Sequence, residues 1–195
     1  LFFTSCSEFN NIIKSGDYLY RYEAAKQYYA DGKYTRAVVL LQDVISVLKG
    51  TDKGEESLYL LGISAYKARD YEAAANFLKK YYETYTNGLY TQDARFYNAM
   101  ALYKNTPEPK LDQTETYEAV TAFQNLLEIF PQSIYAKESQ DMIFKLQDKL
   151  VEKEYLSAKT YFDLGSYFGN CNFGGNNYQA CIITDRKSTR LNSSH

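Results

Sequence analysis

The sequence predicts an all-α protein in which tandem helix–turn–helix repeats form an α-solenoid, and three observations indicate this fold class. Aromatic residues recur at a step of 37 residues, at Tyr22, Tyr59 and Phe96. A second aromatic series keeps the same step seven residues later, at Tyr29, Tyr66 and Tyr103. Between the two series each unit carries one small residue, namely Ala25, Gly62 or Ala99. A fixed period of this length is typical of stacked repeat proteins, which bind partners along a surface.

Each unit is expected to be a pair of helices that cross closely at the small residue. Apolar positions spaced by three and four residues indicate amphipathic helices. Asp31-Gly32-Lys33 separates the two helices of the first unit, and Arg69-Asp70 separates those of the second. The pattern resembles the tetratricopeptide repeat, a helix–turn–helix unit of about 34 residues. The matching positions are Gly62, Tyr28, Ala37, Ala74, Ala119, Leu41, Leu78, Phe123 and Pro131.

The third unit departs from the regular step. Eight extra residues separate its helices, within residues 104–114, where Pro107 and Pro109 favour a loop. The pattern resumes at Ala119 and stops at Pro131. A helix is then expected over about residues 133–151, and residues 154–167 repeat the pattern of the first unit. A partner helix is expected to begin at Tyr178.

Four segments follow from these patterns: residues 1–6, a linker over residues 7–17, the repeat domain over residues 18–184, and residues 185–195. The last segment resembles the in-frame translation of a common sequencing adapter and is excluded from the fold. It contains His195, the single histidine of the chain. Leaving out its three basic and one acidic residues changes the net charge from −2 to −4. A mildly acidic domain argues against nucleic-acid binding.

The first six residues resemble the end of a bacterial lipoprotein signal peptide. Apolar residues are followed by the small Thr4 and Ser5 and then by Cys6, which would be acylated. Ser7 lacks the carboxylate of an inner-membrane retention signal, so the outer membrane is the expected destination. The alternative is that Cys6 is simply a buried cysteine. No stretch approaches the roughly 20 apolar residues of a transmembrane helix.

The pattern contains no recognisable catalytic centre, cofactor site or metal site. No nucleophile has a histidine partner outside the excluded segment, and the cysteines lack the spacing of zinc ligands. The glycine-rich residues 173–176 are not followed by the Lys-Ser/Thr of a phosphate-binding loop. Cys171 and Cys181 could form a disulfide in an oxidising compartment, or Cys181 could be a small buried residue. We therefore expect a protein that is not an enzyme and that needs no cofactor.

The aromatic series allow two interpretations. The first helix of such a repeat faces the concave side, so the aromatics could form a platform for an extended peptide. They could equally be the core between repeats, since aromatic stripes on helices are most often buried. The predicted groove residues are Tyr22, Tyr29, Tyr59, Tyr66, Phe96 and Tyr103.

The order of these motifs resembles the BamD family of outer-membrane assembly lipoproteins, in the form found in Bacteroidetes. The matching segments are Ser5-Cys6, Tyr18-x-x-Arg21-Tyr22-x-x-Ala25, Asp31-Gly32-Lys33-Tyr34, Asp70-Tyr71-Glu72-Ala73-Ala74, Phe130-Pro131-x-Ser133-x-Tyr135-Ala136 and residues 150–165. The resemblance implies a protein anchored by its lipid at the periplasmic face of the outer membrane. It also implies two partners, unfolded β-barrel precursors at the N-terminal repeats and the barrel-shaped insertase subunit at the C-terminal repeats.

Two alternatives stay open at this point. A SusD-like nutrient-binding lipoprotein also uses such repeats, but it recognises glycans and needs a much longer chain. Tryptophan, a usual platform for sugars, is absent from this chain. A generic periplasmic repeat scaffold would share the fold without lipidation at Cys6.

Overall fold

The computed structural model describes the backbone of residues 4–164 and the side chains of residues 8–163. This part of the chain consists of eight helices and contains no strand. The helices are α1 Thr4–Lys14, α2 Tyr18–Ala30, α3 Tyr34–Val47, α4 Asp52–Lys67, α5 Tyr71–Thr84, α6 Thr91–Asn105, α7 Thr114–Ile129 and α8 Ala136–Leu164.

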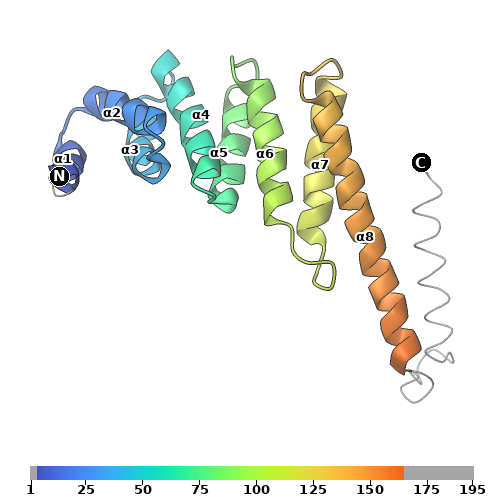
Figure 1. Ribbon diagram of the computed structural model, residues 1–195. Coiled ribbons are helices and arrows are strands. Elements are labelled where there is room, and N and C mark those ends of the chain that lie inside the picture. Colours follow the sequence, from blue (N-terminus) through green and yellow to red (C-terminus); the bar gives the residue numbers. More distant parts are fainter. Residues whose placement is uncertain (1–3, 165–195) are drawn as a thin grey trace.

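The helices follow one another as a row of antiparallel hairpins (Figure 1). Each helix from α2 to α8 packs mainly against its neighbours in the sequence, and successive even-numbered helices also contact one another. The odd-numbered helices are separated by grooves of about 330 Å³ between α3 and α5 and about 710 Å³ between α5 and α7. The face of α2, α4, α6 and α8, called here the even-helix face, is therefore the concave side. The predicted all-α solenoid is confirmed.

The small residues lie where the two helices of a hairpin cross. Ala25, Gly62 and Ala99 are fully enclosed. At Gly62 a methyl group would lie 2.6 Å from the Leu78 side chain, so α4 and α5 approach too closely for alanine. Leu41, Leu78 and Phe123, which the repeat pattern placed on the second helices, are completely buried. The repeat step therefore identified the core contacts inside each hairpin.

The turns inside the first two hairpins close in the same way. Lys33 N–H donates to the Tyr28 carbonyl at 2.8 Å, and Asp70 N–H donates to the Ala65 carbonyl at 3.0 Å. This bond pattern requires a left-handed residue just after the helix. Gly32 fills that position with φ 73°, and Arg69, 37 residues later, fills it with φ 66°. Arginine adopts this conformation at a steric cost that glycine does not have.

Side chains cap several helices. The Asp17 carboxylate accepts from the backbone N–H of Leu19 at 2.9 Å and of Tyr20 at 3.1 Å, at the start of α2. Asp70 caps α5 in the same way through the N–H of Ala73. These bonds satisfy donors that the first helical turn leaves without partners.

Two parts of the predicted organisation differ from the structure. The segment expected as a linker is mostly helical, since α1 ends at Lys14 and buries Ile12. Phe9 of α1 lies edge-on to Tyr28, with ring centroids 5.5 Å apart. The helix expected over residues 133–151 and the unit expected from residue 154 are one continuous helix of 29 residues, α8. α8 contains no glycine or proline, and Glu152-Lys153-Glu154 favours helix, so nothing interrupts it.

The insertion between α6 and α7 is a loop, as predicted, and α8 holds it in place. Lys149 Nζ donates to Thr106 Oγ1 at 2.6 Å and to the Pro107 carbonyl at 3.2 Å. Lys153 Nζ donates to the carbonyls of Lys110 at 2.9 Å and Leu111 at 3.0 Å. The segments expected beyond residue 164, including Cys171, Cys181 and the adapter-like end, lie outside the described residues.

Candidate peptide-binding face

Tyr22, the first aromatic of the 37-residue series, joins the first repeat to the second. It is only 2% exposed, and its hydroxyl donates to the Glu56 carboxylate on α4. Lys26 Nζ lies 2.9 Å from Glu56 Oε1. The amines of Lys26 and Lys53 lie 5.2 and 5.4 Å from the centre of the Tyr22 ring. Tyr22 is therefore covered by charged side chains.

These neighbours shift the ionisation of the cluster. Burial, followed by the hydrogen bond to Glu56, raises the pKa of Tyr22 to about 12. Burial also acts to raise the pKa of Glu56, but hydrogen bonds from Tyr22 and Lys26 outweigh it and lower this pKa. The hydrogen bond to Glu56 is the main cause of a raised pKa at Lys26. At neutral pH the cluster thus holds a neutral phenol between a carboxylate and an ammonium group.

Tyr59 and Phe96 occupy the same repeat position but are covered by stacked rings. Tyr59 is parallel to Tyr90, with centroids 4.3 Å apart, and its hydroxyl lies 3.5 Å from Asp93. Phe96 is 4% exposed and parallel to Tyr135, with centroids 4.1 Å apart. Burial raises the pKa of Tyr59, and burial followed by Asp93 raises that of Tyr135 to about 12. Tyr59 and Phe96 therefore hold successive repeats together.

The burial of Tyr22 and Phe96 corrects part of the predicted groove. Neither ring is open to a ligand, and the alternative interpretation, a core between repeats, describes them. The physical reason is that residues at the start of the next repeat cover this position, namely Lys53 and Glu56 over Tyr22 and Tyr135 over Phe96. Tyr59 is partly buried beneath Tyr90 and can offer a ligand little more than its edge.

The second series of aromatics is more accessible. Tyr29, Tyr66 and Tyr103 are each half-buried on the even-numbered helices. Tyr66 lies edge-on to Tyr97 of the next repeat, at 5.3 Å between centroids. Burial raises the pKa of Tyr29, Tyr66 and Tyr97. Their hydroxyls therefore stay protonated at neutral pH and can both donate and accept hydrogen bonds.

Negative charge accompanies these tyrosines. Burial is the main cause of the raised pKa of Tyr97, followed by Asp93 and then Glu138. For Tyr66, burial is again the main cause of the raised pKa, followed by Tyr71 and Tyr97, and Glu138 adds a smaller contribution. The centre of the even-helix face thus combines aromatic edges, phenolic hydroxyls and carboxylates. This combination can bind an extended polypeptide that carries aromatic side chains and hydrogen-bond donors.

Three aromatics of this face were missed from the sequence: Tyr90, Tyr97 and Tyr135. Tyr90 and Tyr135 lie in loops, at Gly88-Leu89-Tyr90 and Ser133-Ile134-Tyr135. Their separation equals the 37-residue step plus the eight-residue insertion, as it does for Ala74 and Ala119. The same correction for the insertion could therefore have identified Tyr90 and Tyr135 as equivalent positions. Tyr97 has no aromatic counterpart 37 residues earlier, where Leu60 stands, and no periodic signal could have found it.

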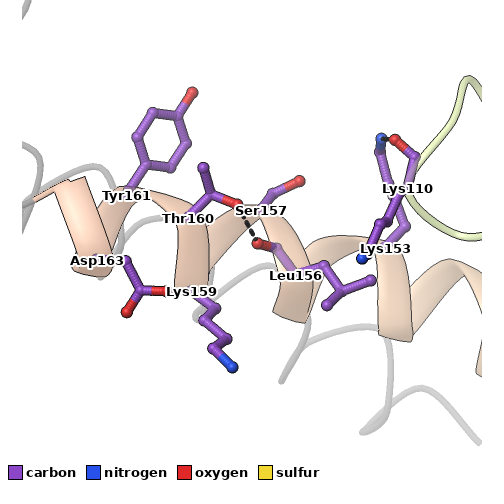
Figure 2. Close-up of a pocket in the computed structure, with 8 residues that line it drawn as sticks. All are labelled: Lys110, Lys153, Leu156, Ser157, Lys159, Thr160, Tyr161 and Asp163. Carbon is purple, nitrogen blue, oxygen red and sulfur yellow. Dashed lines mark hydrogen bonds between the residues drawn. The ribbon is translucent and has the colours of Figure 1, made fainter.

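Nothing in the described part of the chain suggests catalysis. No group of three or more His, Cys, Asp or Glu side chains could hold a metal ion within those residues. A cavity of about 540 Å³ lies along α8, where Lys153 meets the carbonyl of Lys110 (Figure 2). Its hydroxyl groups include Ser157 and Thr160, and Thr160 Oγ1 donates to the Leu156 carbonyl at 2.8 Å. None of the described residues lining this cavity is a histidine that could activate these hydroxyls.

Comparison with known proteins identifies the family. Residues 17–175 match the YfiO family, described as outer membrane lipoprotein. The chain belongs to this family. A relative in Aquifex aeolicus (strain VF5), the putative outer membrane protein assembly factor BamD, is 26% identical over 167 residues. This match covers 85% of the chain and 55% of the relative, so the chain spans about half the length of the curated relative it matches.

The family match confirms the resemblance to assembly lipoproteins that the repeat motifs predicted. It favours that interpretation over a nutrient-binding lipoprotein and over a generic repeat scaffold. It also associates the chain with the outer membrane. Among the described helices, none is both long and apolar enough to cross a bilayer. The side chain of Cys6 lies outside the described side chains, so acylation of Cys6 stays a prediction.

Proposed function

We propose that this chain is a non-enzymatic component of the machinery that folds β-barrel proteins into the outer membrane. In this proposal it is lipid-anchored through Cys6 at the periplasmic face, binds unfolded barrel precursors and supports the insertase subunit. Family membership and the name of the Aquifex relative support this location in the outer membrane. The even-helix face supports the binding role.

The observation that carries the proposal is the row of half-buried tyrosines on successive even-numbered helices. Tyr29, Tyr66 and Tyr103 are spaced by one repeat each and share one side of the solenoid. A row of this kind can contact an extended chain, in which side chains on one side recur every second residue. A precursor's C-terminal strand, with alternating apolar residues and a terminal aromatic, has this form.

The two aromatic series differ in burial, and in this proposal they have different roles. Tyr22 and Phe96 are inaccessible and hold the repeats in register, whereas Tyr29, Tyr66 and Tyr103 keep an exposed edge. A bound aromatic side chain would pack edge-on against these rings, as Tyr97 already does against Tyr66. The hydroxyls would accept from or donate to the peptide backbone of the precursor.

A peptide-binding assay tests this role. The probe is a fluorescent ten-residue peptide with alternating apolar residues and a C-terminal phenylalanine, compared with a scrambled peptide of the same composition. The chain is expected to bind the ordered peptide, and Tyr66→Ala should weaken binding about tenfold or more through the loss of an aromatic contact. Tyr20→Ala is the matched control, because Tyr20 is an exposed tyrosine of α2 that lies nine residues, or two and a half turns, before Tyr29 and so on the other side of the helix.

Unchanged peptide affinity in Tyr29→Ala and Tyr66→Ala would show that the even-helix face does not bind the peptide. Equal affinity for the ordered and scrambled peptides would show that the chain does not recognise the alternating apolar pattern. Fractionation of cells tests the anchor separately. Cys6→Ser, expressed from the protein's own gene, should move the protein from the membrane fraction to the soluble periplasm, because a lipid chain is required for membrane binding.

A further inference from the structure

The odd-numbered helices form a second groove on the side opposite the tyrosines. It lies between α5 and α7, has a volume of about 710 Å³, and is floored by Arg95, Asn98 and Leu102 of α6. Along α5 its lining residues run from Ala75 to Glu83. At 1.5 Å per residue this wall is about 12 Å long, which accommodates about four residues of extended chain.

Arg95 lies at the floor of this groove without a counter-charge. Its guanidinium stacks over the Tyr82 ring, with Cζ 4.2 Å from the ring centre. Its Nε is buried and has no hydrogen-bond acceptor. Within the described part of the chain, no carboxylate oxygen lies within 4.0 Å of its nitrogens. A partly buried cation with no carboxylate partner is costly, and a carboxylate in the groove would relieve that cost.

The floor around Arg95 is fixed by hydrogen bonds. Asn98 is 4% exposed, and its Nδ2 donates to the Ala75 carbonyl at 2.8 Å. The Tyr82 hydroxyl donates to Asn98 Oδ1 at 3.4 Å. Tyr82 therefore presents a ring of fixed orientation to the arginine. Because Cζ lies over this ring, the terminal N–H groups of the guanidinium stay available to a carboxylate in the groove.

We propose that this groove binds an extended segment of a partner protein through one acidic side chain, which pairs with Arg95. The planar guanidinium suits a carboxylate better than a neutral amide, because two N–H groups can donate to the two oxygens. Asn76, Thr121 and Asn125 line the walls and can bond the backbone of such a segment.

The rim of the groove limits which acidic segments fit. Glu83 and Glu118 also line it, and both are exposed. Glu83 lies 4.0 Å from Lys79 on the same helix and is partly compensated. A run of acidic residues would meet these carboxylates, so the groove selects a single Asp or Glu between uncharged residues. This site is separate from the even-helix face and does not depend on its role in precursor binding.

The test uses fluorescence anisotropy with the full chain and two labelled decapeptides. Each peptide consists of glycine and serine around a central Leu-Glu-Leu or Leu-Gln-Leu, with an amidated C-terminus. The Glu peptide is expected to bind at least tenfold more tightly than the Gln peptide. Arg95→Gln should abolish this preference, while Glu118→Gln should strengthen binding of the Glu peptide by removing a rim carboxylate.

Lys80→Gln is the charge-matched control, because Lys80 lies on α5 but faces the neighbouring groove of α3 and α5. Circular dichroism and the urea midpoint establish that each variant folds. Equal affinity for the two peptides, or an unchanged preference in folded Arg95→Gln, would overturn the proposal. The proposal would also be overturned if Lys80→Gln reduced the preference for the Glu peptide as much as Arg95→Gln does, because the effect would then be one of net charge.

Discussion

The first junction between repeats and the two that follow use the same aromatic position in different ways. Tyr22 is covered by Lys26, Lys53 and Glu56. Tyr59 and Phe96 are covered instead by the parallel rings of Tyr90 and Tyr135. The difference arises in the loops, because the loop before α4 carries Gly50 and Thr51 and has no tyrosine to stack.

This comparison shows that the repeat positions an aromatic ring while the loop decides what covers it. A ring buried by another ring is stabilised mainly by removal of apolar surface from water, which salt and pH change little. A ring covered by ammonium and carboxylate groups depends on charges that are partly solvated. The first junction should therefore respond to pH, and the later ones to changes in side-chain size.

The largest effect is expected from removing a ring at the third repeat. Phe96→Ala empties a site that is 4% exposed and deletes the stack with Tyr135. The free energy of unfolding should fall by about 3–5 kcal/mol, the usual cost of deleting a buried phenylalanine. Urea unfolding followed by circular dichroism measures the change. A decrease of less than about 1 kcal/mol in the free energy of unfolding would show that the stack of Phe96 and Tyr135 does not hold the third repeat together.

A smaller loss is expected from adding a methyl group at the centre of the second repeat. Gly62→Ala places Cβ 2.6 Å from the Leu78 side chain and 3.3 Å from its backbone nitrogen. The expected destabilisation is about 1–3 kcal/mol, as for other overpacked cores. Gly16→Ala is the control, because nothing lies within 4 Å of the added atom. A neutral Gly62→Ala would contradict this expectation. It would show that α4 and α5 can separate enough to hold a methyl group, as the helices around Ala25 do in the first hairpin.

A gain in stability is expected at the turn of the second hairpin. Arg69 has φ 66°, and Gly32 serves the same role one repeat earlier. Arg69→Gly should raise the free energy of unfolding by about 1 kcal/mol, because glycine has no Cβ to clash in this conformation. Thermal unfolding detects the change. A lower melting temperature would show that the arginine side chain contributes contacts that outweigh the backbone strain.

The smallest effect is expected at the charged junction. Glu56→Gln should cost less than about 1 kcal/mol at neutral pH, because Glu56 is partly exposed. The pKa of Glu56 is lower in the folded protein than its ordinary value of 4.5. Its contribution is therefore present above that ordinary value and is lost as pH falls through the folded pKa.

The difference between Glu56→Gln and the unmodified chain should accordingly be constant at neutral pH and shrink as the pH falls below 4.5 through the folded pKa of Glu56. Urea midpoints at several pH values measure it, with the exposed Glu72→Gln as a control. A difference that stayed constant with pH would show that the Glu56 charge does not stabilise the first junction.

The repeat step in the sequence was enough to predict the fold and the close contacts within hairpins. It located Ala25, Gly62 and Ala99 because each hairpin needs a small residue where its helices cross. It could not separate buried from accessible aromatics, since Tyr22 and Tyr29 are both on the first helix and differ only in how the next repeat covers them. The continuity of α8 was missed because a renewed pattern from Tyr155 suggested a new unit.

Other features depend on contacts between distant residues. Tyr97 contacts Tyr66 of the preceding repeat, and Arg95 lies over the ring of Tyr82 in the preceding helix. Neither contact follows from spacing along the chain. Arg69 in a left-handed conformation was also hidden, because the usual signal for that position is glycine.

Photo-crosslinking in living cells tests most directly whether the even-helix face receives barrel precursors. A photoreactive phenylalanine derivative would replace Tyr66 in the intact protein, and in a second strain it would replace Tyr20, an exposed residue on the other side of α2 from Tyr29. The account predicts adducts with newly made outer-membrane barrel proteins from position 66 and none from position 20. Adducts from position 20 alone, or equal adducts from both positions, would contradict it.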